Sequence, residues 1–218
     1  MNFAVIGASG YVGDAVVREL AARGHAVTAF ARNPAKVFAA PNVRAVAADV
    51  TAADFAAQLA GFDAVVSTFN PGWTNPHIGR DFRAGYAAIL AAAKAAHVPY
   101  LLAVGGAGSL YVAPGVQLID TPEFPREIFD GANAARELLR ELQARDDLNW
   151  SLISPPARLG AEAGFSEDRT GKYRLGQDDL LMDGDAPAGI SVADLAVAIA
   201  DDVEQKAHLR QRFTVASV

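Results

Sequence analysis

Short apolar runs alternate along the chain with longer stretches in which apolar residues recur every three or four positions. The apolar runs are typical of buried strands, and the longer spacing is typical of helices with one buried face. The runs predict seven strands, at residues 2–7, 25–31, 42–49, 62–69, 100–106, 150–154 and 212–217. Strands separated by helices pair in parallel through right-handed crossovers. The pattern therefore predicts an α/β protein with a doubly wound, mainly parallel sheet and helices on both faces.

Helix boundaries are marked by capping residues. Gly24 ends the helix predicted to follow the first strand. Thr51 precedes Asp54 by three residues, and Ser191 precedes Asp194 in the same way, a capping-box pattern that predicts a helix start at each. Apolar residues at helical spacing predict the buried faces of three helices: Phe82, Tyr86, Ile89, Leu90 and Ala93; Ile128, Ala132, Ala135, Leu139 and Leu142; Val192, Leu195, Ile199 and Val203.

The alternation breaks once. Residues 157–190 are rich in Gly, Asp and Arg and carry only short strand-like pieces. We expect residues 1–156 to form the main domain and 157–190 a small lobe over the cleft. Residues 191–218 would return to the main domain as a closing helix and strand. Open α/β sheets bind ligands at the carboxyl ends of their strands, where this lobe would lie.

Composition narrows the function classes. No apolar run approaches the ~20 residues of a membrane span, and the N-terminus lacks the pattern of a secretory signal, so we expect a cytoplasmic protein without a membrane partner. The chain has no cysteine, which excludes disulfides, thiolate catalysis and cysteine zinc sites. No other spacing suggests a metal site. The net charge of −6 argues against nucleic acid as a partner. Oligomeric state, monomer or homodimer, stays open.

Three glycines connect the first strand to the first helix. Gly7, Gly10 and Gly13 form the pattern G-x-x-G-x-x-G. Gly7 permits a tight turn, Gly10 allows a pyrophosphate to approach the backbone, and Gly13 brings the helix close to the strand. The helix N-terminus then presents free N–H groups to the phosphates. The motif predicts a Rossmann-type dinucleotide site.

The second strand indicates which dinucleotide is bound. A free ribose 2′-OH is usually met by an acid about 20 residues after the glycines, but this chain has Arg32, with Lys36 four residues later. A guanidinium suits a 2′-phosphate, so NADP(H) is preferred over NAD(H), although a solvated basic loop is the alternative. Asp49 is placed to accept from the adenine amino group, or it simply precedes a cap at Thr51. Residues 67–70 should follow the ribose and nicotinamide.

Five stretches together resemble the atypical short-chain dehydrogenase/reductase superfamily: "GASGYVG" (7–13), "AFARNPAK" (29–36), "AADV" (47–50), "LLAVGGAGSL" (101–110) and "RTGKYRLG" (169–176). Within it the chain is similar to small NAD(P)H-binding proteins of the NADH-flavin reductase and NAD-dependent epimerase-like type. The resemblance implies that one group of residues binds the cofactor: Gly7, Ser9, Gly10, Tyr11, Val12, Gly13, Arg32, Asp49 and Val50. It also implies a group along the middle and the nicotinamide: Thr68, Phe69, Val104, Gly105, Ser154 and Pro155.

The chain departs from the superfamily in its acid–base chemistry. The parent enzymes use a Tyr-x-x-x-Lys pair, but no tyrosine here has a lysine four residues on. Gly105 and Gly106 stand where similar enzymes have Ser-Ser. Without that proton donor, carbonyl reduction would lose roughly 10²–10⁴ in rate per acid–base group. A conjugated acceptor delocalises the incoming charge, so we expect an NADPH-dependent reductase of a flavin-like or quinone-like acceptor. The alternatives are an NADP(H)-sensing regulator without turnover, and an epimerase-like or carbonyl-reducing enzyme with a substitute acid.

The substrate candidates lie in loops. Trp73 and His77 follow the fourth strand, Tyr111 follows the fifth, and Tyr173 lies in the 157–190 segment. Trp73 could cover a planar acceptor or simply fix its loop. The weak catalytic candidates are Ser109, Tyr111 and His77. The basic residues Arg169, Lys172 and Arg174 could attract a phosphorylated acceptor such as a flavin nucleotide, or could pair with Asp178, Asp179 and Asp183 to hold the lobe.

Overall fold

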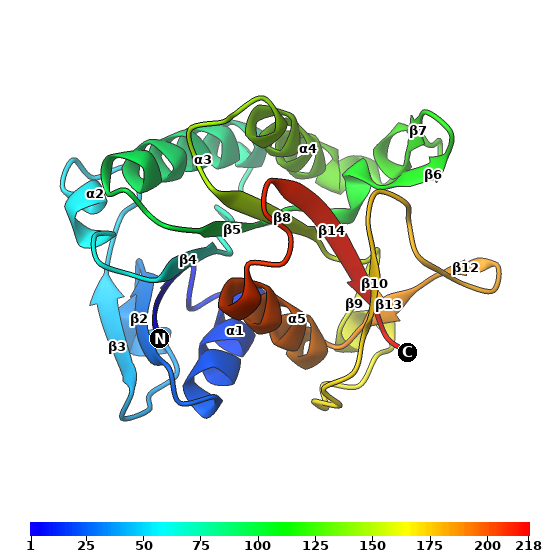
Figure 1. The fold of residues 1–218 in the computed structure, drawn as a ribbon. Coiled ribbons are helices and arrows are strands. Elements are labelled where there is room, and N and C mark those ends of the chain that lie inside the picture. The colour runs from blue at the N-terminus through cyan, green and yellow to red at the C-terminus, as the bar shows by residue number, and fades with distance from the viewer.

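A computed structural model describes residues 1–218. Its centre is an eight-stranded sheet with the order β10-β14-β8-β5-β4-β1-β2-β3 (Figure 1). All neighbouring strands are parallel except β10, which pairs antiparallel with β14. The strands are β1 (Asn2–Ile6), β2 (Ala26–Ala31), β3 (Val43–Ala47), β4 (Ala64–Ser67), β5 (Leu101–Val104), β8 (Trp150–Ser154), β10 (Arg174–Gly176) and β14 (Gln211–Ala216). The doubly wound sheet that the hydrophobic pattern predicts is confirmed.

Helices cover both faces of the sheet. On one face lie α1 (Tyr11–Ala22) and α5 (Val192–Gln205), and on the other lie α2 (Phe55–Gln58), α3 (Ile78–Ala95) and α4 (Phe129–Gln143) (Figure 1). Short 3-10 helices occur in the loops: η1 (Pro34–Lys36), η2 (Ala107–Ser109), η3 (Leu118–Asp120), η4 (Arg126–Ile128) and η5 (Ala161–Ala163). No helix is both long and apolar enough to cross a lipid bilayer.

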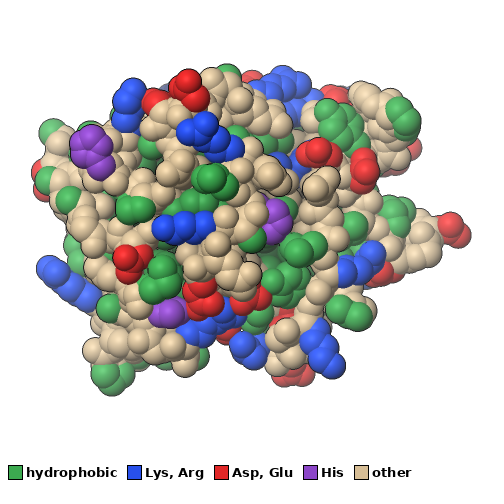
Figure 2. Space-filling model, viewed as in Figure 1, with side chains coloured by type: hydrophobic (Ala, Val, Ile, Leu, Met, Phe, Trp, Pro, Cys, Tyr) green, Lys and Arg blue, Asp and Glu red, His purple; other side chains and the backbone are tan.

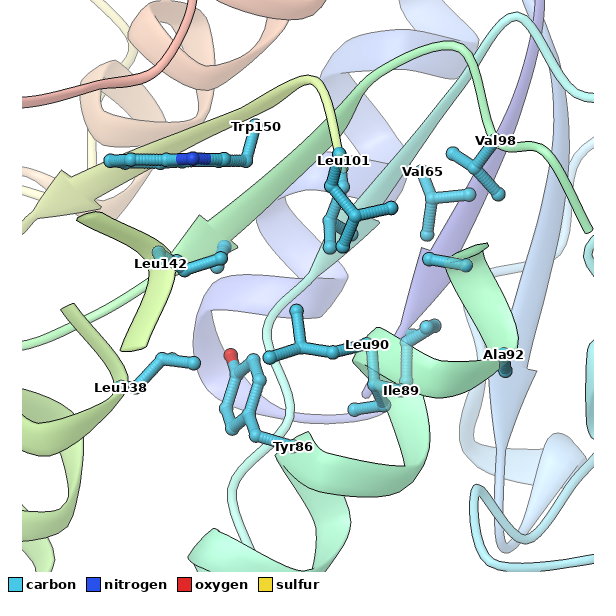
Figure 3. Close-up of a cluster of buried hydrophobic side chains, with 14 of the residues drawn as sticks. Val65, Tyr86, Ile89, Leu90, Ala92, Val98, Leu101, Leu138, Leu142 and Trp150 are labelled. Atoms are coloured by element: carbon cyan, nitrogen blue, oxygen red, sulfur yellow. The ribbon is translucent and has the colours of Figure 1, made fainter. Parts of the chain in front are cut away.

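Each helical layer closes its own hydrophobic core. The α2, α3 and α4 side buries a cluster of 23 residues, and the α1 and α5 side a cluster of 22. Figure 3 shows the first cluster, where Ile89 and Leu90 of α3 and Leu138 and Leu142 of α4 lie below Leu101 and Trp150 of the sheet. Truncation of such a leucine to alanine typically destabilises a domain by about 2–5 kcal/mol. The two cores hold the central strands in place from both faces of the sheet.

The two predicted caps behave differently. Ser191 caps α5, because its hydroxyl accepts from the N–H of Asp194 at 3.0 Å. Thr51 does not open a helix: its hydroxyl donates to Asp49 Oδ1 at 2.7 Å, and α2 begins only at Phe55. The capping-box prediction at Thr51 is therefore wrong. The Asp49 side chain closes a turn there, and this turn competes with helix formation.

Residues 157–190 contribute to several small strand pairs. β9 (Arg158–Leu159) pairs with β13 (Gly189–Ile190), and β11 (Met182–Asp183) pairs with β12 (Ala186–Pro187). β10 from the same segment extends the central sheet at its edge. A further hairpin of β6 (Tyr111–Ala113) and β7 (Val116–Gln117) follows β5. The segment is therefore joined to the main sheet along the chain's last strand.

An ion pair joins the 157–190 segment to α1, and hydrogen bonds join it to α5. Glu19 is buried and accepts from Arg23 at 2.8 Å and from Arg169 at 2.7 Å. Asp194 accepts from the Thr170 hydroxyl at 2.6 Å. On the face in Figure 2, acidic and basic side chains are intermixed. The sequence alternative in which basic residues pair with the nearby aspartates is confirmed for Arg174, which binds Asp183. Arg169 also holds the segment, but its partner is Glu19.

Candidate functional site

A cavity of about 800 Å³ runs along the carboxyl ends of the central strands. It extends from β3 and β2, past β1 and β4, to β5 and β8, in the order of the sheet. The point where the strand order reverses lies between β1 and β4, and this is where doubly wound sheets bind ligands. Most of the predicted cofactor residues line this one cavity: Gly7, Ser9, Gly10, Tyr11, Val12, Gly13, Arg32, Asp49, Val50, Thr68, Phe69, Val104, Gly105 and Pro155.

The glycine loop has no space for side chains at two of its positions. Gly7 has φ +80°, and a Cβ there would lie 2.8 Å from the Thr68 carbonyl oxygen. A Cβ on Gly13 would overlap the carbonyl of Gly7. Gly13 therefore lets the first turn of α1 lie directly against the end of β1. This is the close strand–helix approach that the spacing of the glycines predicts.

The N-terminus of α1 presents unpaired N–H groups to the cavity. The first hydrogen bond of the helix runs from the Asp14 N–H to the Gly10 carbonyl at 2.8 Å. The N–H groups of Tyr11, Val12 and Gly13 therefore have no acceptor within the helix. Such groups, together with the helix dipole, favour phosphate binding. The loop and helix end fit the diphosphate of a dinucleotide.

The β2 and β3 end of the cavity is the charged end. Arg32 is exposed and lines the cavity just after β2. Asp49 follows β3 and accepts from the Thr51 N–H at 2.9 Å and from its hydroxyl at 2.7 Å. Hydrogen bonds from Thr51 hold the pKa of Asp49 below its usual value. Lys36, predicted from the sequence to bind the cofactor, lies exposed in η1 and does not line the cavity.

The middle of the cavity is fixed by Thr68 and Phe69. The Thr68 hydroxyl donates to the Ile6 carbonyl at 2.9 Å and contacts the Gly7 carbonyl at 3.2 Å, which joins the ends of β4 and β1. Phe69 packs edge-on against Tyr86 and beside Phe82. A Cβ on Gly85 would overlap the Phe69 ring, so this glycine allows α3 to receive it.

The far end is closed by a wall that sequence reasoning missed. It consists of residues after β7 and on α4, namely Leu118, Thr121, Glu123, Phe124, Pro125, Ile128, Gly131, Ala132 and Ala135. We expected residues 157–190 to cover this end, but only Ala157 and Leu159 of that segment line the cavity. One signal was available: Gly131, Ala132 and Ala135 form a stripe of small residues on α4. Such a stripe indicates a helix face that something approaches closely.

Trp73, in the loop after β4, packs against this wall. Its side chain is 59% exposed and lines the cavity after β4. A Cβ on Gly131 would lie 3.0 Å from the Trp73 ring and 2.9 Å from Ile78. The indole therefore lies against α4 where α4 has no side chain. The contact with α4 supports the alternative in which Trp73 fixes its loop, and its place in the cavity lining is compatible with a cover over an acceptor.

The end of β5 has no side chain to offer a proton. A Cβ on Gly105 would lie 2.7 Å from Leu152 Cδ2, and Leu152 is buried in the core. Ser154 ends β8 with its hydroxyl fully buried and without a hydrogen-bond partner, and it does not line the cavity, whereas Pro155 does. The structure therefore does not bring Ser154 to the site.

The remaining candidate residues lie outside the cavity. Ser109 is buried, and its hydroxyl contacts Arg212 Nη1 at 3.3 Å. His77 is the exposed residue before α3. Tyr111 lies in the β6–β7 hairpin, and the Tyr173 hydroxyl donates to Asp201 at 2.6 Å. Burial raises the pKa of Tyr173, and the bond to Asp201 adds to this effect. None of these four lines the cavity, so their expected contact with substrate is not seen.

The charges within the cavity are few. Arg32 is the only lysine, arginine or histidine that lines it, and Asp49 and Glu123 are the only carboxylates. Arg169 and Arg174 are bound to Glu19 and Asp183, outside the cavity. No group of three or more acidic or histidine side chains could hold a metal ion. The site therefore offers phosphate recognition at one end and apolar contact at the other.

Comparison with known proteins identifies what the cavity resembles. The sequence pattern of a family described as NAD(P)H-binding matches residues 7–203. The protein named Uncharacterized protein YwnB, from Bacillus subtilis strain 168, is 40% identical over 224 residues, which cover 100% of this chain and 99% of that protein. The match therefore spans the glycine loop, the cavity walls and the 157–190 segment alike.

Two solved structures share the whole fold. A protein from Bacteroides thetaiotaomicron, provisionally named an epimerase, is 37% identical, with a TM-score of 0.88 over 100% of this chain and 97% of that one. A protein from Streptococcus pneumoniae TIGR4, provisionally named an NADH-flavin reductase, is 31% identical, with a TM-score of 0.85 over 100% of both chains. The chain is thus similar along its full length to proteins with two different proposed activities.

Proposed function

Because this chain belongs to the NAD(P)H-binding family, with a Rossmann-type fold, we propose that it is an NADPH-dependent reductase of a conjugated, planar acceptor. The observation that carries the proposal is the composition of the cavity. It has a phosphate-binding end, an apolar end wide enough for a ring, and no side chain at the end of β5 that could act as a general acid. The similarity to the Streptococcus pneumoniae protein that is provisionally named an NADH-flavin reductase is consistent with this proposal.

Several residues would hold the cofactor. The N–H groups at the start of α1 would bind the diphosphate, and the guanidinium of Arg32 would pair with a 2′-phosphate. Thr68 and Phe69 would define the middle of the binding path. Reduced nicotinamide, when bound, supplies a hydride to the acceptor. Val104, Gly105 and Pro155 line the cavity beyond the glycine loop and would contact the nicotinamide side.

The chain's own contribution to the reaction is positioning. Phe69, Trp73 and Phe124 present aromatic surface to a planar acceptor and exclude water from it. The acceptor gains the hydride and one proton, and the cofactor is oxidised. Because Gly105 and Gly106 follow β5 and offer no acidic side chain, the proton would come from solvent. An acceptor that spreads the added negative charge over its own ring tolerates this, whereas an isolated carbonyl does not.

The test follows NADPH oxidation by absorbance in the presence of menadione, riboflavin or FMN, one at a time. We expect turnover with at least one acceptor. The matched control is Gly13→Val, whose side chain would overlap the Gly7 carbonyl and remove the phosphate site, with circular dichroism to check folding. Tight NADPH binding without turnover of any acceptor would contradict the proposal and favour a cofactor-sensing protein.

A further inference from the structure

Building on the proposed function, we infer that the acceptor is an uncharged ring compound and that Glu123 selects against acceptors that carry a phosphate or carboxylate. The acceptor would lie at the far end of the cavity, away from the glycine motif. It is based on the chemistry of the wall, on the distribution of charge along the cavity, and on where the nearby arginines lie.

The acceptor end is mainly apolar. Phe69 and Trp73 contribute from the loop after β4, Phe82 from α3, and Phe124 and Ile128 from the segment before α4. Two of the polar side chains at this end make hydrogen bonds within the protein. The Thr121 hydroxyl donates to the Leu118 carbonyl at 2.8 Å, and Asn70 Oδ1 accepts from the Gly72 N–H at 2.7 Å. The wall presents ring surface and has no cation for an anionic group.

Charge along the cavity points the same way. The single cation, Arg32, follows β2, and the cavity continues from there past β1, β4, β5 and β8. The single ionisable side chain of the far wall is Glu123, in the segment where Thr121, Glu123, Phe124 and Pro125 all line the cavity. A phosphate or carboxylate on the acceptor would therefore meet a like charge at this end and no opposite charge.

The arginines nearest in sequence to the far wall do not offset the negative charge of Glu123. Arg136 of α4 is bound to Asp120 at 2.8 Å and to Asn133 at 2.6 Å. Arg126 lines a separate hollow on the outer side of Trp73, which it shares with the carboxylates Glu127 and Asp130. The rim of the acceptor end therefore carries more acidic than basic groups, and a neutral acceptor is the one that it fits.

Riboflavin and FMN provide a matched pair of probes, because they share the redox ring and differ only in the phosphate. For the unaltered protein with saturating NADPH, we expect kcat/KM for riboflavin to exceed that for FMN by about tenfold, and menadione to be used as well. The preference should weaken at high salt, since exposed charges are screened over about 10 Å at 0.1 M ionic strength. An FMN rate equal to or above the riboflavin rate would overturn the inference.

Two variants assign the preference to Glu123. Glu123→Gln should narrow the riboflavin-to-FMN ratio of kcat/KM, and Glu123→Lys should reverse it. The matched control is Glu127→Gln, which removes a neighbouring carboxylate that lines only the outer hollow, and its ratio should stay that of the unaltered protein. A ratio unaffected by Glu123→Lys would overturn the role of Glu123. Failure of every acceptor would instead count against the proposed function.

Discussion

The phenolic hydroxyl of Tyr11 donates a 2.6 Å hydrogen bond to Oε1 of Glu167, 156 positions further along the chain. The same carboxylate oxygen accepts from the Ala161 N–H at 2.8 Å, and Gly160 leaves space for the phenol, since a Cβ there would overlap it. Burial, aided by the bond to Glu167, raises the pKa of Tyr11 to about 12, so the hydroxyl remains a donor at neutral pH. These two hydrogen bonds connect the start of α1, which follows the glycine loop, to the 157–190 segment.

Tyr11→Phe should remove the bond to Glu167 and make local opening of the 157–190 segment more frequent, without unfolding the protein. A net hydrogen bond contributes about 0.5–1.5 kcal/mol, so opening of the segment should rise roughly two- to tenfold. Hydrogen exchange of the amides at Ala163, Gly164 and Phe165, all bonded within the segment, measures this directly. Tyr111→Phe is the control, because its hydroxyl has no partner in the protein. Unchanged exchange rates in Tyr11→Phe would show that the Tyr11–Glu167 bond does not hold the segment.

Arg32→Gln should weaken NADPH binding and leave NADH binding unchanged. Hydrogen bonds to charged groups contribute about 1.5–3 kcal/mol, so the Kd for NADPH should rise about 10–100-fold. Calorimetric titration of both dinucleotides gives the comparison. Arg44→Gln removes an exposed charge from neighbouring β3, outside the cavity, and should alter neither Kd. An equal loss for both dinucleotides in Arg32→Gln would mean that Arg32 does not recognise the 2′-phosphate.

Trp73→Ala should impair acceptor use more than cofactor binding. Stacked aromatic pairs contribute about 0.5–1.5 kcal/mol beyond their area, so KM for the acceptor should rise up to about tenfold while the NADPH Kd is kept. Trp73→Phe should restore most of the loss. The chain has only two tryptophans, and the other, Trp150, is buried. Quenching of fluorescence by menadione should therefore come from Trp73 and disappear in both variants.

Ser109→Ala, His77→Ala and Tyr111→Phe should each retain turnover within about twofold. None of the three side chains lines the cavity, and loss of a true general acid would reduce kcat by roughly 10²–10⁴. Ser109→Ala removes a contact to Arg212, so its thermal stability should be measured alongside kcat. A loss of several hundredfold in a folded variant would revive the hypothesis of a substitute proton donor.

Acidification should destabilise the junction around Glu19. Hydrogen bonds from Arg169 above all, and from Arg23, hold the pKa of Glu19 below its usual value despite its burial. A carboxyl whose pKa is lowered on folding stabilises the fold above its unfolded pKa, and that stability is lost as the pH falls through the folded pKa. Urea unfolding near pH 7 and near pH 3 should show a smaller pH dependence in Glu19→Gln than in the unaltered protein. Equal pH dependence in both would contradict this assignment.

The sequence predicted well where one chain segment determines the geometry. The strand, glycine loop and helix of residues 2–22 form one local unit. The position of Arg32 at the edge of the sheet follows from the end of the second strand at Ala31. The helix faces were also predicted correctly, since Ile89, Leu195 and Ile199 are buried as their spacing indicates. These features depend on periodicity and on steric limits within a few residues.

Prediction failed where long-range contacts decide the outcome. The wall at residues 118–135 begins in loops without periodicity, and only its packing across the carboxyl edge of the sheet makes it part of the cavity. Ser109 and Tyr173 look available in the sequence, but Arg212 and Asp201, about 100 and 28 positions away, engage them. At Thr51 a local side-chain bond to Asp49 was stronger than the helix signal.

The contact between Gly105 and Leu152 also constrains how the protein could acquire a new chemistry. A serine introduced at 105 alone would meet Leu152 Cδ2, and overpacking of a core typically costs about 1–3 kcal/mol. Shortening Leu152 alone would leave a void instead. Because the two side chains share this space, we expect the effects of the two substitutions on stability to be non-additive. A serine that donates a proton from position 105 would therefore depend on which residue stands at position 152.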